Sequence, residues 1–305
     1  MSALAARWAP VPSQFIPIDG MQLHVRDEGP REDPMPVVLL HGTSASLHTW
    51  EGWVAGLRGR HRVITFDLPA FGLTGPAPDG DYRIEAYVRH VIAVLDHLGI
   101  QHCVLGGNSL GGAIAWSTAL AYPKRIDRLI LVDAAGYAVK ADSVPLGFRL
   151  ARMPLLGRLM SHFLPRSLIA SSLRNVYGHP ERITPALVDR YYAMTTRAGN
   201  RQALLLRVQG AASGPPAARI RELTLPTLIL WGGQDRLIPL AAGHRFAADI
   251  AGSQWVEFAD LGHVPHEEDP ARTLAPVLAF LADAGADAGA DAGANPGVTP
   301  GGSLQ

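Results

Sequence analysis

One serine in this sequence stands where a nucleophile could be held: Ser109, in the run Gly-Asn-Ser-Leu-Gly at 107–111. The run follows an apolar segment that ends at Gly106 and precedes a helical pattern that starts at Leu110, which predicts a sharp strand-to-helix turn. Glycines two positions to either side fit this turn, because its strained backbone leaves no room for a Cβ. The turn would expose the serine hydroxyl at a helix N-terminus, where free N–H groups stabilise developing negative charge. No Gly-Lys-Ser/Thr sequence follows, so a Walker-type phosphate site is not supported.

A serine hydroxyl is a weak nucleophile at neutral pH, and it needs an imidazole, oriented by a carboxylate, to take its proton. Asp235 and His263 each follow an apolar run, and with Ser109 they give the chain order serine, aspartate, histidine. Because open α/β sheets build their sites in the loops at strand C-termini, we expect these three side chains to meet. Asp133 also ends an apolar run and could orient the same histidine. The acid therefore stays open between Asp235, which we favour, and Asp133.

A tetrahedral intermediate also needs N–H groups that donate to its oxyanion. The predicted donors are the N–H of Leu110, directly after the serine, and the N–H of Thr43, in the small-residue loop after the apolar run at 37–40. His41 opens this loop, and we expect it to anchor the loop by a side-chain hydrogen bond rather than to act as a base. His266 has acidic neighbours, so we expect it at a helix entry or facing solvent.

Eight short runs of mostly apolar and β-branched residues alternate with helical patterns, which predicts an α/β protein with a mostly parallel sheet flanked by helices. The first two runs are joined by Asp19-Gly20, a hairpin signal, so we expect the sheet to open with an antiparallel pair. The other six are nearly all apolar, as expected of strands that helices cover on both faces. The predicted strands are 15–18, 21–26, 37–40, 63–67, 103–106, 129–133, 227–231 and 254–259, and the predicted helices are 84–98, 110–121, 239–250 and 270–281.

The chain divides into four segments. A helical segment at 137–218 separates the two parts of the core, at 1–136 and 219–282, and is predicted to be a lid inserted after the sixth strand. The Ala/Asp/Gly repeat at 283–305 lacks apolar side chains that would offset the entropy of ordering, so we expect a disordered tail. Apolar lid residues are predicted to line the substrate pocket: Leu146, Phe148, Leu150, Met153, Leu155, Leu156, Met160 and Phe163. The lid arginines are expected on solvated helix faces, with binding of a substrate carboxylate as the alternative: Arg149, Arg152, Arg158 and Arg166.

Composition excludes several other classes of protein. The 305 residues include 27 basic and 27 acidic side chains, and this zero net charge disfavours nucleic acid as a partner. A single cysteine, Cys103, excludes an intramolecular disulfide, and no spacing of residues indicates a metal or a cofactor. The longest uncharged stretch, 101–123, has a glycine-rich centre that argues against a membrane helix. No export signal is evident, so we expect a cytoplasmic protein; the sequence leaves its oligomeric state open.

Together these features resemble the α/β-hydrolase family, over roughly Phe15 to Leu281. The matching elements are His41-Gly42, Asp-Leu-Pro-Ala-Phe-Gly at 67–72, Gly-Asn-Ser-Leu-Gly-Gly at 107–112, Trp-Gly-Gly-Gln-Asp at 231–235 and Gly262-His263. The resemblance implies an α/β-hydrolase fold with a mostly parallel eight-stranded sheet and a helical lid over the pocket. Ala70 stands where the family usually has glycine, a departure that bears on the shape of that loop.

Serine at the turn implies acyl chemistry, because the dehalogenases and epoxide hydrolases of this family carry aspartate there. The sequence favours a serine hydrolase that cleaves small apolar carboxylic esters of short to medium acyl chains, with Ser109 as nucleophile, His263 as base and Asp235 as acid. Lactonase and thioesterase activities use the same residues. The alternative is hydrolysis of a carbon–carbon bond in dienoic ring-cleavage products, whose enzymes have a similar Gly-Asn-Ser-x-Gly-Gly turn but usually carry tryptophan where Val264 stands here. A binding module without turnover is disfavoured, because the catalytic set is complete.

Overall fold

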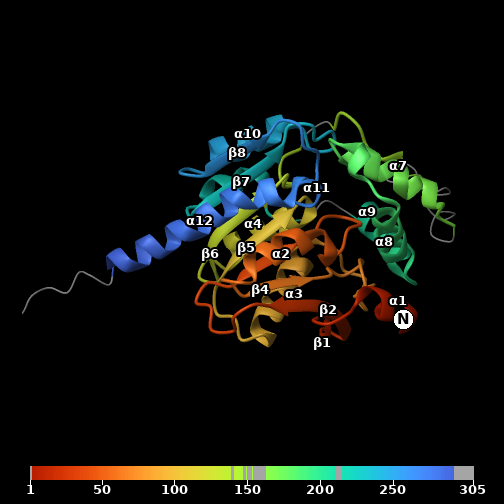
Figure 1. The fold of residues 1–305 in the computed structure, drawn as a ribbon, viewed down its shortest axis with the longest axis horizontal. Coiled ribbons are helices and arrows are strands. Elements are labelled where there is room, and N and C mark those ends of the chain that lie inside the picture. Colours follow the sequence, from red (N-terminus) through yellow and green to blue (C-terminus); the bar gives the residue numbers. More distant parts are fainter. Residues whose placement is uncertain are drawn as a thin grey trace, which may run out of the picture.

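The computed structural model describes residues 2–138, 141–146, 149, 153, 163–210 and 214–291. An eight-stranded sheet forms its centre, with the strand order β1-β2-β4-β3-β5-β6-β7-β8 (Figure 1). Strands β3 to β8 run parallel to one another, whereas β2 is antiparallel to both β1 and β4. This arrangement confirms the mostly parallel sheet predicted from the sequence. The strands are β1 (Gln14–Ile18), β2 (Met21–Glu28), β3 (Val37–Leu40), β4 (Val63–Phe66), β5 (Cys103–Asn108), β6 (Ile126–Val132), β7 (Thr227–Gly232) and β8 (Gln254–Phe258).

The burial of the strands follows from their composition. Every residue of β3, β4, β5 and β7 is buried, as expected for apolar strands that are covered on both faces. The β1–β2 hairpin turns at Asp19 and Gly20, whose φ angles of 49° and 77° are those of the turn that joins two-residue hairpins. The hairpin therefore adds the predicted antiparallel edge to the parallel sheet.

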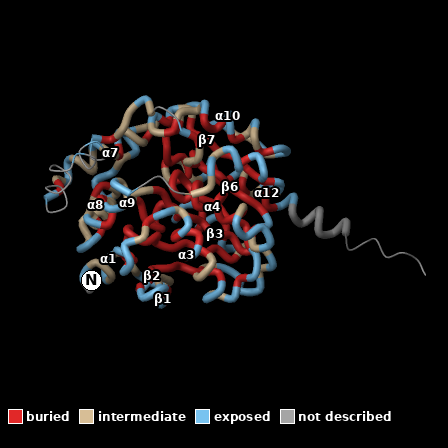
Figure 2. Tube along the Cα trace, turned by 180° about the vertical axis from the view of Figure 1, so that it is seen from behind, coloured by how far each residue is buried: buried red, intermediate tan, exposed pale blue. Residues whose placement is uncertain are grey.

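Helices cover both faces of the sheet and enclose two hydrophobic cores, so the buried residues gather around the strands (Figure 2). One core lies between the sheet and helices α3, α4 and α10. The other lies between the sheet and helices α2 and α12, and includes the fully buried Trp50 and Trp53. The helices outside the β6–β7 connection are α1 (Ser2–Trp8), α2 (Glu51–Leu57), α3 (Ile84–His97), α4 (Leu110–Ala121), α10 (Leu240–Asp249), α11 (Pro265–Glu268) and α12 (Pro270–Asp291).

Residues 137–218, which form most of the connection between β6 and β7, are called the insertion below. Its described residues form helices and no strand, and the helices lie together beside the sheet (Figure 1). Leu173, Tyr177 and Val188 form a small core between them, which also includes Val264 from the loop after β8. The insertion is thus packed against the loop that carries His263. It contains α7 (Arg166–Val176), α8 (Pro185–Thr196), α9 (Asn200–Gln209) and 3-10 turns at Pro180–Arg182 and Ala217–Glu222.

Two of the four insertion arginines named in the sequence analysis can be placed. Arg149 is exposed. Arg166 is also exposed and forms an ion pair with Asp189 at 2.7 Å on the outer surface. Both therefore lie on solvated faces. Arg152 and Arg158 lie outside the described residues.

Helix α12 corrects the predicted start of the tail. The helix continues to Asp291, past the expected boundary at Asp283. Its first turns are packed in a core through Leu274, Val277 and Phe280, and extending an existing helix needs no new nucleus. The alanines of the repeat have the highest helix propensity of any residue, which favours continuation of the helix. The remaining tail residues, 292–305, lie outside the described part of the chain.

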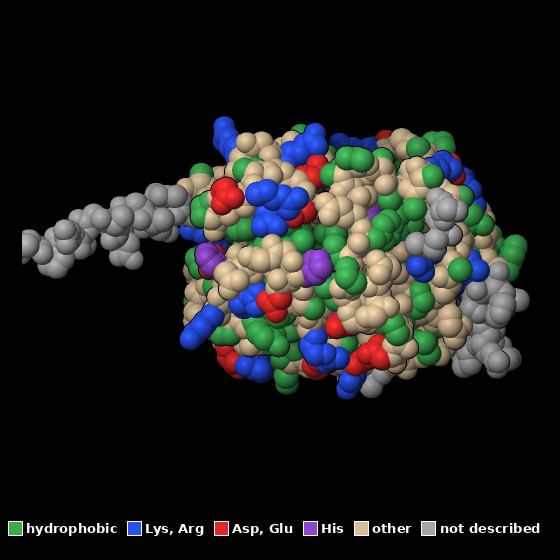
Figure 3. All heavy atoms as spheres, turned by 90° about the horizontal axis from the view of Figure 1, so that it is seen from below, with side chains coloured by type: hydrophobic (Ala, Val, Ile, Leu, Met, Phe, Trp, Pro, Cys, Tyr) green, Lys and Arg blue, Asp and Glu red, His purple; other side chains and the backbone are tan. Residues whose placement is uncertain are grey.

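The surface agrees with the balanced composition. On the face seen in Figure 3, basic and acidic side chains are interspersed, without a broad area of one sign. This face therefore offers no extended cationic area to a polyanion. No helix among the described residues is long and apolar enough to cross a membrane.

Candidate active site

Ser109 lies on a strained turn between β5 and α4. Its φ angle is 55°, a conformation that residues other than glycine seldom adopt. A Cβ at position 107 would lie 2.2 Å from the Gly111 carbonyl carbon, and a Cβ at position 111 would lie 2.1 Å from Leu40 O. Glycine is therefore required on both sides of the serine, as the sequence predicts.

Asp235 and His263 meet at the C-terminal edge of the sheet. His263 Nδ1 lies 2.6 Å from Asp235 Oδ2, and both residues are buried. The other carboxylate oxygen accepts hydrogen bonds from the N–H groups of Leu237 at 2.8 Å and Ile238 at 2.9 Å. These two bonds hold the carboxylate so that Oδ2 faces the ring. The Nδ1 atom then carries the proton, and Nε2 is the nitrogen free to accept one.

Asn108, which the sequence analysis did not single out, joins the turn to the histidine loop. Its side-chain nitrogen donates to His263 O at 2.9 Å and to Val132 O at 3.2 Å. His263 N in turn donates to Val176 O at 2.7 Å, at the end of α7. Among the described residues, the Ser109 hydroxyl forms no hydrogen bond with the His263 ring. In enzymes without bound substrate, catalytic hydrogen bonds are often long and tighten when substrate binds.

Asp133 lies beside the Asp235–His263 pair. Single ligand atoms of these three side chains lie within 4.8 Å of one another, and Asp133 Oδ1 accepts a hydrogen bond from Gly232 N at 3.0 Å. Burial, together with the negative charge of Asp235, raises the pKa of Asp133 well above its usual range. A protonated Asp133 adds no second negative charge beside Asp235.

His41 anchors the loop after β3, as predicted. Its Nε2 accepts a hydrogen bond from Leu68 N at 2.9 Å, and its Nδ1 donates to Gly42 O at 2.8 Å. Burial lowers the pKa of His41, so the ring is neutral and can play both roles. The anchored loop places Thr43 in the wall of the cavity that contains Ser109.

His266 does not face solvent, which is one of the two positions expected from the sequence. It lies in α11, at the expected helix entry, but it is fully buried, stacked on Trp50 at 4.0 Å between ring centres. Its Nε2 lies 3.0 Å from Thr49 Oγ1, and burial holds the pKa of His266 well below its usual value. Its acidic neighbours, Glu267 and Glu268, do not indicate solvent, because both are engaged in buried contacts.

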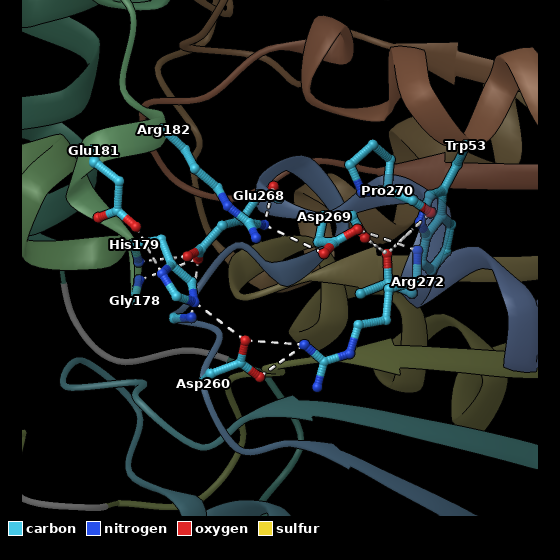
Figure 4. Close-up of polar contacts among 12 residues, drawn as sticks. Trp53, Gly178, His179, Glu181, Arg182, Asp260, Glu268, Asp269, Pro270 and Arg272 are labelled. Carbon is cyan, nitrogen blue, oxygen red and sulfur yellow. Dashed lines mark hydrogen bonds and ion pairs between the residues drawn. The ribbon is translucent and has the colours of Figure 1, made fainter.

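Glu268 joins the loop after β8 to the insertion. Its carboxylate accepts hydrogen bonds from Gly262 N at 2.9 Å, His179 N at 2.6 Å and Gly178 N at 3.1 Å. Figure 4 shows this carboxylate between the insertion, on one side, and the loop after β8, on the other. His179 also contacts Asp260 in that loop, with 3.1 Å between Nε2 and Oδ2. The loop that carries His263 is thus fastened to the insertion by a buried charge.

A cavity of about 340 Å³ contains Ser109, Thr43 and Leu110 in its wall. Leu110 is the first residue of α4, so its N–H has no acceptor within the helix. Thr43 N is not a donor in any turn or loop bond of the described residues. Both residues therefore line the cavity that contains Ser109, and neither N–H is used in a turn or loop bond of the described residues. The wall continues mainly through small and apolar residues, among them Ala113, Trp116, Ala135, Gly136 and Pro215.

The predicted pocket lining is wrong for each residue that can be placed. Leu146, Met153 and Phe163 are 48%, 51% and 68% exposed, and none of them lines the cavity. Apolar character shows that a side chain can be buried, but not which surface it meets. Phe148, Leu150, Leu155, Leu156 and Met160 lie outside the described residues.

Residues 35–270 match the family described as alpha/beta hydrolase fold. The match covers more than half of the chain, so the chain belongs to this family and is a hydrolase. This agrees with the resemblance carried by the sequence motifs.

The chain is also similar to named enzymes of the family. It is 31% identical to 2-hydroxymuconate semialdehyde hydrolase from Pseudomonas sp. (strain CF600), over 88% of this chain and 93% of that protein. The structure of a meta-cleavage product hydrolase from Pseudomonas fluorescens IP01 aligns with a TM-score of 0.76 and 25% identity, over 89% of this chain and 97% of that one. A thermophilic esterase from Thermogutta terrifontis aligns with a TM-score of 0.73 and 25% identity, over the same shares of the two chains.

Proposed function

We propose that this enzyme hydrolyses a carbon–carbon bond next to a ketone or aldehyde in a conjugated dienoic acid, the class of compound formed by ring cleavage. The observation that carries the proposal is the 31% identity, over 88% of the chain, to a 2-hydroxymuconate semialdehyde hydrolase. The structural similarity to a meta-cleavage product hydrolase also supports it. The comparisons thus support carbon–carbon bond hydrolysis, the alternative left open by the sequence, better than the ester hydrolysis that the sequence favoured.

In the proposed mechanism Ser109 is the nucleophile, His263 the base and Asp235 the acid. Because Asp235 holds the Nδ1 side of the ring, His263 Nε2 takes the serine proton as Ser109 Oγ bonds to the carbonyl carbon. The carbonyl oxygen becomes an oxyanion, which the N–H groups of Leu110 and Thr43 stabilise. These donors are fixed before substrate binds, one by a helix N-terminus and the other by the anchored loop.

The bond between the carbonyl carbon and its neighbour then breaks. The substrate reacts as its keto tautomer, in which the enol proton has moved to the carbon next to the attacked carbonyl group, so the fragment that leaves contains a conjugated ketone. The electron pair of the broken bond passes to this fragment, whose ketone oxygen accepts the charge, and His263 returns the proton to the carbon that leaves. An acyl group remains on Ser109. Water gives a proton to His263 and attacks the acyl carbon, and the acid is released as the proton returns to Ser109 Oγ.

We also propose that the insertion acts as the lid of this site. Arg207, Gly210, Gly214 and Pro215, at its C-terminal end, line the cavity that contains Ser109. A roof of this kind would exclude bulk water while the carbanion-like fragment is protonated.

Hydrolysis of small carboxylic esters is the second candidate, and Val264 is the observation that favours it. A tryptophan is usual at that position in the carbon–carbon hydrolases, whereas Val264 packs in the small core of the insertion. The similarity to a thermophilic esterase gives the same candidate structural support. Lactone and thioester hydrolysis would use the same residues.

Substrate comparison tests the proposal. We expect kcat/KM for a dienoic keto acid such as 2-hydroxymuconate semialdehyde to exceed that for each para-nitrophenyl ester, from acetate to octanoate, by about tenfold or more, a difference of about 1.4 kcal/mol in transition-state binding. An ester preferred by the same margin would replace the proposal with the esterase function. Covalent labelling of Ser109 by a phosphonate is the control that the serine is reactive in the preparation used.

A further inference from the structure

Arg207 is a charged residue in the wall of the cavity that contains Ser109. It lies near the C-terminal end of α9, and the cavity reaches from Thr43, Ser109 and Leu110 to its side chain. Among the described residues that line the cavity, no other carries a charge. A lone guanidinium in an otherwise neutral wall determines which ligands the cavity can accept.

The guanidinium has no anionic partner among the described residues, where no ion pair includes Arg207. Its Nε atom is buried without a hydrogen-bond partner. The Tyr87 hydroxyl interacts with it, but this group is neutral and donates its own hydrogen to Pro69 O at 3.1 Å. Removing a cation from water without a compensating anion is costly, and a buried N–H without an acceptor adds to that cost.

Three other arginines that are buried or partly buried are paired with carboxylates. Arg190 of α8 forms an ion pair with Glu267 and has Glu51 at 3.8 Å. Arg26 contacts Glu51 at 2.8 Å. Arg62 forms two hydrogen bonds with Asp27, at 3.0 and 2.9 Å. Arg207, which is partly buried, has no such partner among the described residues, and it lies in the wall of the cavity, where a substrate can supply one.

We propose that Arg207 binds a carboxylate of the substrate, at the opposite end from the bond that is cleaved. The inference rests on the proposed function, and it specifies that the substrate enters as an anion with its acid group directed to α9. A guanidinium can hold a carboxylate through two parallel N–H···O bonds. A neutral substrate of the same size would leave Arg207 buried and unpaired, so the residue selects against it.

The test compares two esters of similar size in the whole chain: mono-para-nitrophenyl succinate, whose acyl group ends in a carboxylate, and para-nitrophenyl butyrate, which is neutral. Arg207→Met removes the charge and keeps an unbranched side chain. We expect it to lower kcat/KM for the succinate ester by about 30-fold or more, as for other buried charge pairs that lose one partner, and to change kcat/KM for the butyrate ester by less than about threefold. Arg166→Met, which removes an exposed arginine of the insertion, should change neither value. Equal losses on both esters, or no loss on the succinate ester, would overturn the inference.

A measurement on the unaltered chain covers the case in which Arg207→Met does not fold. Hexanoate and hexanamide differ in charge and little in size, and each can compete with a phosphonate that labels Ser109. If Arg207 binds a carboxylate, hexanoate protects Ser109 at a concentration about tenfold lower than hexanamide or less. Equal protection by the two compounds contradicts the inference.

The two proposals can fail separately. If the unaltered chain does not cleave dienoic keto acids but hexanoate still protects Ser109 selectively, the carbon–carbon hydrolase proposal fails and the carboxylate site stands. If it cleaves them and hexanoate protects no better than hexanamide, the carboxylate site at Arg207 fails alone.

Discussion

The Asn108 side chain holds the backbone of His263, with 2.9 Å between Asn108 Nδ2 and His263 O. The same nitrogen donates to Val132 O at 3.2 Å, so one amide spans the ends of β5, β6 and the loop after β8. Because Asn108 immediately precedes Ser109, this contact sets the position of the proposed base relative to the proposed nucleophile. It explains how residues far apart in the sequence keep a common geometry.

Replacing Asn108 with alanine should therefore lower kcat while leaving the fold intact. The substitution removes both hydrogen bonds and leaves His263 O without its donor, which costs about 1–3 kcal/mol of stability; Val132 O still accepts from Ser109 N at 3.1 Å. Displacement of the histidine loop should reduce kcat by about tenfold to 100-fold. The check is steady-state kinetics beside thermal unfolding. Asn175→Ala, which removes a side-chain bond to Ser143 in the insertion, is the control; a loss of activity no larger than in that control would show that Asn108 does not position His263.

Asp235→Asn and Asp133→Asn separate the two candidate acids. Asparagine at 235 presents an N–H to the histidine and favours the wrong tautomer, so turnover should fall by up to about 10⁴-fold. Asn at 133 should cost far less, because an amide oxygen can still accept from Gly232 N and the raised pKa of Asp133 favours its neutral form. The kcat values of the two variants, measured under identical conditions, show which aspartate orients His263. The reverse order would move the acid to Asp133.

The pH dependence of stability gives an independent check on Asp133. Its pKa is raised in the folded protein, so its contribution to stability is full below the ordinary aspartate pKa of about 3.9 and is lost as pH rises from there towards the raised value. The Asp133→Asn variant cannot lose that contribution. Its free energy of unfolding, relative to the unaltered chain, should thus increase by up to about 1.4 kcal/mol per pH unit within that window. Denaturant unfolding of both proteins between pH 4 and pH 8 measures it, and a difference independent of pH would mean that Asp133 is ionised.

Glu268→Ala should destabilise the protein by weakening the attachment of the insertion. It leaves three N–H groups, of Gly262, Gly178 and His179, without their acceptor, and each such loss costs about 1–3 kcal/mol when buried. We expect Tm to fall by at least about 6 °C and amide exchange to rise at 176–182. Glu181→Ala is the matched control, since Glu181 is 70% exposed and its carboxylate contacts the His179 side chain. Equal Tm values for the two variants would show that Glu268 does not fasten the insertion.

Much of the fold could be predicted because local sequence determines it. Apolar runs of four to seven residues marked each strand to within a few positions, and the glycines around Ser109 marked the turn, because contacts at 2.1 and 2.2 Å permit nothing larger. The role of His41 could also be inferred, since its loop position is local. In each case the sequence pattern that predicts the feature is local, although the contacts of Gly111 and His41 are with the distant residues Leu40 and Leu68.

The site features that were missed depend on contacts between distant segments. Glu268 reads as a solvated charge next to Glu267, yet its carboxylate is buried against Gly178 and His179, about 90 positions earlier in the chain. Arg207 looks like any arginine on an amphipathic helix until the cavity places it with Ser109. The exposure of Leu146 and Phe163 follows the same rule: hydrophobicity is visible in the sequence, but its partner surface is not.

In the proposed reaction, Ser109 attacks the substrate carbonyl group and so allows the adjacent carbon–carbon bond to break. The most direct test is the turnover of 2-hydroxymuconate semialdehyde by the purified chain and by Ser109→Ala, followed by the loss of substrate absorbance. We expect turnover by the unaltered chain and a kcat lower by about 10³-fold or more in Ser109→Ala. The melting temperature should be unchanged, because the substitution removes a single hydroxyl from a turn held by its glycines. A variant that retains activity within about tenfold of the unaltered chain, or an unaltered chain that does not cleave this compound, would contradict it.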